Sequence, residues 1–292
     1  MPKTISMSKI ESQVAAHERV ANEHSRDHRE LYLSHREKLT ALVLQNGPGK
    51  GGRVALLGAG NCNDVDLAVL LAAFDEVHLV DIDRQAITAA RAQLASELQT
   101  RVFLHAPVDL TGLLVIWDAA RTRQPSASDL EAWPARGAQS VQKVLPGPFD
   151  LVVSCCVLTQ MSWGLRQCLG PNHPLEAQAR EAMFAAHLRS MCALAAGGKA
   201  LLACDLISTE YYPLDALAAD EDLAALMERL IRERNFYQGA NPLLVRSLLY
   251  RDPVVTAAVQ SAQWPTPWLW DGPKDRTYLV YALLLDCSRQ AR

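Results

Sequence analysis

The stretch RVALLGAGNCNDVDL, residues 53–67, decides the fold. An apolar run over residues 54–57 ends at Gly58, Ala59 and Gly60, and a second apolar run begins at Val65. Glycine at two such positions permits tight backbone dihedral angles and lets a ligand approach the backbone closely. The stretch therefore predicts a strand that turns into a helix at a ligand-binding turn.

The composition is that of an ordinary globular protein. The chain has 292 residues, of which 49% are hydrophobic and 21% are charged, and its formal net charge is −3. This length fits one large domain. The sequence lacks the basic footprint of a nucleic-acid-binding protein, so we expect a small-molecule partner rather than a nucleic acid. Association into a homodimer is compatible with the composition.

The sequence shows no targeting signal, no membrane span and no cysteine-based metal motif. The segment MPKTISMSKIESQ has no apolar signal core, and no apolar run reaches the length of a membrane span. The seven cysteines show neither a CxxC pair nor a zinc-binding spacing. We therefore expect a cytoplasmic protein with buried reduced thiols, no membrane partner and no metal site.

Beyond the turn residues 46–52, strand and helix patterns alternate along the chain. Expected strands cover residues 53–59, 76–82, 101–106, 149–158 and 199–207, and helical patterns lie between them. Such alternation is typical of βαβ units in a doubly wound parallel sheet. We expect residues 1–46 to form an N-terminal helical segment, with one continuous helix over residues 8–45. Residues 51–292 then form the main domain, with a helical cap inserted at about residues 207–263.

The C-terminal region predicts a strand pair that runs antiparallel. WPTPWLW and RTYLVYALLLD are separated only by DGPKD, which is too short for a parallel crossover. Pro265 and Pro267 place the first strand of the pair at an edge. The fold class predicted is thus α/β, a seven-stranded, mostly parallel sheet that closes with an antiparallel hairpin.

Two acids follow the expected second and third strands. Asp81 ends the second strand, twenty-one residues after Gly60, and Asp109 lies just beyond the third strand. An acid at the first of these places accepts hydrogen bonds from a ribose diol, and Ile82 beside it suits a purine face. Asn63 and Asp64 are candidates to cap the helix after the turn.

This spacing resembles the class I S-adenosylmethionine-dependent methyltransferases. LLGAG resembles the first motif of that family, Asp81 its ribose-binding acid and Asp109 the acid that faces the adenine amino group; FDLVVSCCVLTQM resembles its fourth motif. The resemblance implies S-adenosyl-L-methionine as cofactor and covers about residues 51–206 and the final hairpin. The cofactor-binding residues that it implies are Gly58, Ala59, Gly60, Asn61, Asp64, Asp81, Ile82, Asp109, Leu110, Ser154 and Cys155.

The sequence departs from the family pattern at two positions. Leu56 stands where the family often has an acid, and Cys62 stands at its third glycine position. Two alternatives therefore stay open. A nicotinamide-dependent oxidoreductase shares the GxG and the acid, although Asn63 replaces the third glycine of GxGxxG. A cofactor-binding scaffold protein without catalysis is the other alternative.

The expected methyl acceptor is the O or N atom of a small metabolite. The fourth motif lacks the D/N-P-P-Y/F sequence of the amine-methylating nucleic-acid enzymes, and it carries Thr159 and Gln160 where small-molecule enzymes have a His pair. The resemblance therefore assigns no general base. Gln160, Trp163 and Tyr211 follow strand ends and are the candidate catalytic residues.

Four histidines, at positions 17, 24, 28 and 35, share one face if residues 8–45 form a single helix. A metal site, a helix-packing stripe and a substrate mouth are all compatible with this pattern. N-terminal helices in the resembled family often close over the cofactor. The candidate substrate-binding residues are His28, Tyr32, His35, Arg36, Tyr212 and Tyr237.

Overall fold

The computed structural model describes residues 7–170, 172–272 and 276–289. Its core is one mixed sheet with the strand order β3-β2-β1-β4-β5-β8-β6, and β7 also pairs with β8. The strands are β1 (Arg53–Leu57), β2 (Glu76–Val80), β3 (Val102–His105), β4 (Leu151–Cys155), β5 (Lys199–Ser208), β6 (Val259–Gln263), β7 (Trp268–Gly272) and β8 (Arg276–Cys287).

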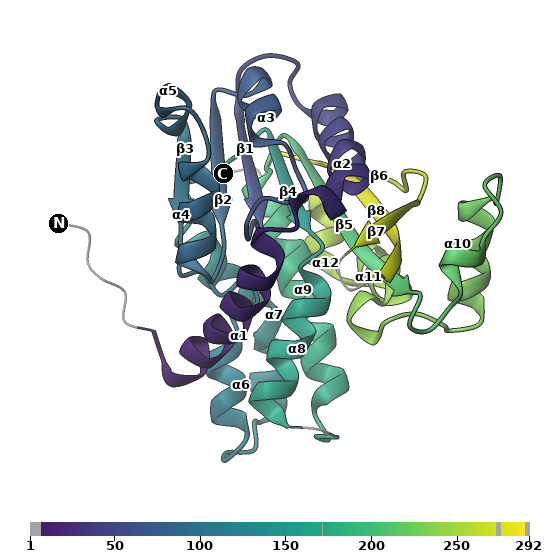
Figure 1. Ribbon diagram of the computed structural model, residues 1–292. Coiled ribbons are helices and arrows are strands. Elements are labelled where there is room, and N and C mark those ends of the chain that lie inside the picture. The colour runs from purple at the N-terminus through teal and green to yellow at the C-terminus, as the bar shows by residue number, and fades with distance from the viewer. Residues whose placement is uncertain (1–6, 171, 273–275, 290–292) are drawn as a thin grey trace.

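Helices cover both faces of the sheet (Figure 1). One face packs against α2 (Leu33–Asn46), α3 (Leu67–Ala73) and α4 (Arg84–Ala92). The other packs against α6 (Leu114–Ala120), α7 (Ala127–Gln142), α8 (Leu158–Leu169), α9 (Glu176–Leu194), α11 (Pro242–Arg251) and α12 (Pro253–Ala258). This two-sided burial explains the near-continuous apolar runs of the parallel strands and confirms the doubly wound α/β prediction.

Strands β1 to β5 are parallel to one another. The chain runs from β1 through β2 to β3 on one side and then returns to β4 on the other side of β1. This reversal makes the crevice beyond the carboxyl ends of β1 and β4 the topological switch point, where open α/β sheets bind ligands.

The antiparallel closing pair is confirmed, but the sheet has eight strands within the described residues rather than the seven expected. β8 runs antiparallel to β5 on one side and to both β6 and β7 on the other. β6 and β7 pair with successive parts of β8, and Pro265 and Pro267 lie between them. Because β6 is a mostly exposed edge strand, VQSAQ, its apolar pattern is too weak to predict it.

The expected single helix over residues 8–45 is wrong. The chain forms α1 (Lys9–Arg26), a short 3₁₀ turn η1 (Arg29–Tyr32) and α2. Side-chain amides of the glycine-rich turn hydrogen-bond carbonyl groups in the last turns of α1: Asn61 Nδ2 donates to Asn22 O at 2.6 Å, and Asn63 Nδ2 donates to Ser25 O at 2.9 Å. The carbonyl of Ser25 is one of the last four of α1 and would be used by a longer helix, so the bond from Asn63 helps α1 to end there.

The segment between β5 and β6 is largely helical. It contains η2 (Leu214–Ala216), α10 (Leu223–Arg232), η3 (Gln238–Ala240), α11 and α12. In Figure 1, α10 lies at the side of the molecule opposite α4 and α5 (Ser96–Gln99). The part of the chain that the structure describes contains no helix long and apolar enough to span a membrane.

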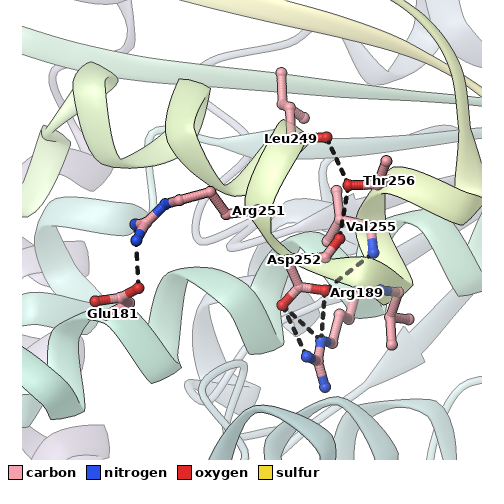
Figure 2. Close-up of polar contacts among 8 residues, drawn as sticks. Glu181, Arg189, Leu249, Arg251, Asp252, Val255 and Thr256 are labelled. Atoms are coloured by element: carbon pink, nitrogen blue, oxygen red, sulfur yellow. Dashed lines mark hydrogen bonds and ion pairs between the residues drawn. The ribbon is translucent and has the colours of Figure 1, made fainter.

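An ion pair anchors α11 and α12 to α9 (Figure 2). Arg189 Nη2 donates to Asp252 Oδ2 at 2.8 Å, and Nε donates to both carboxylate oxygens. Asp252 Oδ1 also accepts from the backbone N–H groups of Val254 and Val255 and so caps α12. One buried carboxylate therefore fixes both helices on α9.

Candidate functional site

The glycine-rich turn after β1 needs glycine for the backbone and for packing. Gly58 has φ +74°, and a Cβ atom there would lie 2.7 Å from Val157 Cβ. Its N–H donates to Val80 O at 2.9 Å. Glycine at position 58 therefore lets the end of β1 pack closely against the β4–α8 connection. This packing requires glycine there even when no ligand is bound.

Asp81 connects two loops at the carboxyl end of β2. Its Oδ2 accepts from Gly60 N at 2.8 Å, and its Oδ1 accepts from Asp83 N at 2.8 Å. The side chain is buried, and burial raises the pKa of the Asp81 carboxyl to about 6. The carboxylate is thus held firmly against the glycine-rich turn.

Asp109 holds the turn that leads into α6. Its Oδ1 accepts from the N–H of Thr111 at 2.9 Å and from its hydroxyl at 2.6 Å, and its Oδ2 accepts from Leu114 N at 3.0 Å. Burial raises the pKa of this carboxyl as well. The hydrogen bonds of Asp109 to protein groups therefore all lie within its own loop.

These three strand ends line a single cavity at the switch point. Its volume is about 50 Å³, and the predicted site residues in its wall are Gly58, Asp81, Ile82, Asp109, Leu110 and Gln160. Among the wall residues that the sequence did not predict, Val14 and Glu18 come from α1. We call this space the switch-point cavity.

Six other residues on the predicted cofactor list lie outside the wall of the switch-point cavity: Ala59, Gly60, Asn61, Asp64, Ser154 and Cys155. The Ser154 hydroxyl is buried and lies 2.9 Å from His187 Nε2. Asp64 Oδ1 lies 3.3 Å from His35 Nε2. Burial raises the pKa of the Cys155 thiol, and all seven cysteines are buried and unpaired, which confirms the expectation for the thiols.

Helix α1 covers the switch-point cavity and is bonded to its rim. Asn22 Nδ2 donates to Asp83 Oδ2 at 3.1 Å. Glu18 lies near Asp81 and Asp83, and burial together with these two carboxylates raises the pKa of Glu18 to about 7. Helix α1, which is distant from the glycine-rich turn in sequence, thus covers the switch-point cavity.

A second and larger cavity, of about 540 Å³, lies on the other side of α8, and we call it the wide cavity. Two of the candidate catalytic residues, Trp163 and Tyr211, line it, and so does Tyr237 from the substrate list. Gln160 lines the switch-point cavity instead, whereas its neighbour Thr159 lines the wide cavity. The first turn of α8 therefore separates the two spaces.

Asp205 is the most distinctive titratable group in the wide cavity. Thr159 Oγ1 donates to Asp205 Oδ1 at 3.1 Å, and burial raises the pKa of the Asp205 carboxyl to about 7. The β5–β8 register shifts between Asp205 and Ile207, and the carbonyl of Leu206 in between accepts from Tyr237 N at 2.9 Å. Such bulges re-aim side chains near functional sites. The sequence reasoning missed Asp205, although an acid inside the apolar run KALLACDLI is a visible signal.

The other candidate substrate-binding residues line neither cavity. His35 is buried, with its Nδ1 accepting from Trp268 Nε1 at 3.1 Å, and Tyr32 packs against Trp270. Arg36 donates to Arg29 O, His28 Nδ1 lies 2.6 Å from His24 O, and the Tyr212 hydroxyl accepts from Arg229. The structure therefore places these five candidate residues where they pack against, or hydrogen-bond to, other groups of the protein.

The four histidines do not form one stripe, because α1 ends before His28. His17 stacks on Trp163, with ring centroids 3.5 Å apart, whereas His35 lies buried on α2. Within residues 7–170, 172–272 and 276–289, no group of three or more His, Cys, Asp or Glu side chains is arranged to hold a metal ion.

No protein-family model and no curated protein matches the sequence. Solved structures do match. The magnesium protoporphyrin IX methyltransferase of Synechocystis, with bound SAH, is 12% identical, with 89% of this chain and 83% of that chain covered and a TM-score of 0.41. The O-methyltransferase TomG of Streptomyces achromogenes, in complex with SAM, is 11% identical, with 97% and 92% covered and a TM-score of 0.38.

An rRNA methylase of Streptococcus thermophilus also matches, at 12% identity, with 86% of this chain and 95% of that chain covered and a TM-score of 0.36. Because each of these TM-scores is below 0.5, the fold assignment rests on the strand order and the connections described above.

Proposed function

We propose that this protein is an S-adenosylmethionine-dependent methyltransferase that acts on an O or N atom of a small molecule. The observation that carries the proposal is the convergence of Gly58, Asp81 and Asp109, from three neighbouring strand ends, on one cavity at the switch point. Open α/β sheets bind nucleotide ligands at this place.

The chemistry of the switch-point cavity suits a nucleoside. Asp81 supplies a carboxylate for the ribose diol, Ile82 and Leu110 supply apolar surface for the purine, and Gly58 leaves the backbone open to a ligand. When bound, S-adenosylmethionine supplies the methyl group and a thioether leaving group, which takes the electron pair of the broken carbon–sulfur bond.

Helix α1 has to move for the cofactor to bind. The switch-point cavity measures about 50 Å³, which is room for only a few water molecules at roughly 10–15 Å³ each on the same measure. The Glu18 side chain lies in the wall of this cavity, so an outward shift of α1 makes room. We propose that α1 opens for cofactor entry and closes again before methyl transfer.

The wide cavity is the proposed acceptor site. Its volume of about 540 Å³ is within the usual range for small-molecule sites. The two cavities are neighbours at α8, because Thr159 lines the wide cavity and the next residue, Gln160, lines the switch-point cavity. The insertion at about residues 207–263 supplies Tyr211, Phe236 and Tyr237 to its wall, so we propose that this insertion selects the acceptor.

Asp205 is the proposed general base. Its pKa of about 7 matches what proton transfer near neutral pH requires. The acceptor's O–H or N–H proton passes to the Asp205 carboxylate while the acceptor atom forms its bond to the methyl carbon, and Asp205 then releases the proton to water. The hydrogen bond from Thr159 orients the carboxylate toward this task.

Methyl transfer from labelled S-adenosylmethionine tests the proposal. The purified protein is incubated with small-molecule and RNA fractions of a cell extract, and we expect label in the small-molecule fraction. Label recovered in RNA would contradict the small-molecule acceptor. Cofactor binding without transfer to any fraction would favour the scaffold alternative, and binding of NADH in place of S-adenosylhomocysteine would favour an oxidoreductase.

A further inference from the structure

We infer that the wide cavity binds a flat aromatic acceptor that carries an anionic group, and that Arg166, Arg180 and Arg276 hold this anion. The inference rests on the proposed function, because it names the class of acceptor for the same transfer. Three arginines and five aromatic side chains line this one cavity.

Aromatic side chains make up much of the wall. They are Trp163, Tyr211, Phe236, Tyr237 and Tyr278. Trp163 already takes part in a parallel stack with His17, with 11° between the rings, and Tyr211 meets Tyr237 edge to face at 5.7 Å. Aromatic surfaces of this kind favour a flat ring over a flexible aliphatic chain because they offer stacking as well as area.

Two of the arginines are held in place and keep free donors. Arg180 pairs with Glu176 and donates to Gln238 Oε1 at 3.1 Å, and Arg276 Nη2 lies 3.1 Å from Glu210 Oε1. A guanidinium has five N–H donors, so each of these arginines can still bind an acceptor oxygen. Fixed guanidinium groups are well suited to recognise a carboxylate or a phosphate.

Arg166 supplies a charge that has no acidic partner of its own in the wall. Among the described residues, no ion pair or hydrogen bond joins its guanidinium to a carboxylate. The wall holds three arginines against Glu176, Glu210 and Asp205. With Asp205 ionised for its role as a base, these charges balance, so the guanidinium of Arg166, which has no acidic partner of its own, is what favours an anionic ligand.

The spacing along α8 sets the shape of the acceptor. Thr159, which binds Asp205, and Arg166 are seven residues apart and lie on the same face of α8. Seven residues of helix span about 10 Å. An acceptor that reaches both ends therefore carries its nucleophile and its anion at opposite ends of a ring system. The buried Ser162 Oγ, which has no partner within the described part of the chain, lies in the wall between these ends.

Binding of two naphthalene probes tests the inference. 6-Hydroxy-2-naphthoate carries a hydroxyl and a carboxylate at opposite ends of two fused rings, and 2-naphthol lacks the carboxylate. Titrations followed by tryptophan fluorescence are expected to give at least about tenfold tighter binding of the acid. Equal affinity for the two probes would overturn the inference.

Arginine variants connect that preference to the wall of the wide cavity. Arg166→Gln and Arg276→Gln should each weaken binding of the acid about five- to tenfold and leave 2-naphthol unchanged. Arg136→Gln removes an exposed arginine of α7 and is the matched control, with no expected change for either probe. Unchanged binding of the acid in both cavity variants would contradict the assignment.

Binding of S-adenosylhomocysteine, measured in the same proteins, separates this inference from the proposed function. Retained binding of S-adenosylhomocysteine together with equal affinity for the two probes means that only the acceptor class is wrong. A preference for the acid without any binding of S-adenosylhomocysteine means that the wide cavity binds anions but the methyltransferase proposal fails.

Discussion

The hydroxyl of Thr159 donates a hydrogen bond to the carboxylate of Asp205, and this bond joins the first turn of α8 to the carboxyl-terminal part of β5. The two residues are 46 positions apart in sequence, and the bond lies where the wall of the switch-point cavity meets that of the wide cavity. A group at this junction can touch an acceptor and still be close to the donor, which is the geometry that a proton acceptor in methyl transfer needs.

Replacing Asp205 by Asn should lower kcat by about 10²–10⁴-fold, because the amide cannot accept the proton. The affinity for S-adenosylhomocysteine should stay unchanged, since Asp205 lies outside the switch-point cavity. Steady-state kinetics and calorimetry check both expectations. A variant with wild-type kcat would contradict the role of Asp205.

The pH profile gives a second test of Asp205. Its pKa of about 7 lies above its usual value of 3.8, so kcat should rise with pH through about 7 as the carboxylate forms. Thr159→Val removes a bond that lowers this pKa and should move the rise to higher pH. A rise at the same pH in both proteins would contradict the assignment. The charged and titratable groups near Asp205 that also affect this profile are Asp64, Cys156, Cys204, Glu210, Tyr237, Arg276, Tyr278 and Tyr281.

Glu18 should make the protein less stable as the pH rises. Burial and nearby carboxylates raise its pKa from 4.5 to about 7, so between these values the folded protein keeps a proton that the unfolded chain has released. Stability therefore falls with rising pH in this window. Glu18→Gln should reduce that slope, of which a part remains because the pKa values of Asp81 and Asp205 are also raised, and it should add on the order of 2 kcal/mol at pH 8.

Urea unfolding across pH 4.5–8 measures the effect of Glu18. Glu23→Gln, an exposed position of the same helix, is the matched control and should keep the wild-type slope. The same slope in Glu18→Gln and in wild type would show that Glu18 ionises freely and does not lie against Asp81 and Asp83.

A side chain at Gly58 should destabilise the fold even without a ligand. Gly58→Ala combines a φ of +74° with a Cβ only 2.7 Å from Val157, and we expect a loss of about 2 kcal/mol or more in the free energy of unfolding. Val157→Ala in the same chain should restore part of this loss, because it removes Cγ2, which lies 2.8 Å from the new Cβ, whereas Val157 Cβ and the backbone strain remain. Fully additive losses in the double variant would contradict the contact.

The pair of Arg189 and Asp252 should matter far more than the neighbouring pair of Arg251 and Glu181 (Figure 2). Asp252→Ala leaves a largely buried guanidinium without its partner and uncaps α12, so about 3–5 kcal/mol should be lost. Glu181→Gln breaks an exposed pair and should cost less than about 1 kcal/mol. Chemical denaturation compares the two variants, and equal losses would contradict the anchoring role of Asp252.

The sequence predicted best what local patterns determine. The glycine-rich turn at Gly58 and the acid at Asp81 follow apolar runs with clear ends, so both strand ends and their meeting at one edge of the sheet could be predicted. The antiparallel pair of β7 and β8 followed from the short segment between them. Strand β6 was not predicted, because an exposed edge strand with polar residues shows no strong alternation of apolar and polar residues.

Features that depend on distant partners could not be predicted. The end of α1 is stabilised by amide groups of Asn61 and Asn63, so a pattern of good helix formers alone suggested a longer helix. Asp205 was visible as an acid in an apolar strand, but its role depends on Thr159, which only the folded sheet brings near. The same holds for Glu18, whose pKa reflects carboxylates more than sixty residues away.

The cofactor assignment makes Asp81 the critical residue of the switch-point cavity. Asp81→Asn keeps the shape of the side chain and removes its charge, and it should weaken binding of S-adenosylhomocysteine by about 1.5–3 kcal/mol. Asp66→Asn, which alters the cap of α3 outside the switch-point cavity, is the control and should bind normally.

Calorimetric titration of the wild-type protein with S-adenosylhomocysteine and with NADH tests the central claim most directly. We predict saturable binding of S-adenosylhomocysteine at one site, no binding of NADH, and loss of affinity in Asp81→Asn. Binding of NADH alone, or binding of S-adenosylhomocysteine that is indifferent to Asp81, would contradict the claim that the switch-point cavity is the site of methyl-donor recognition.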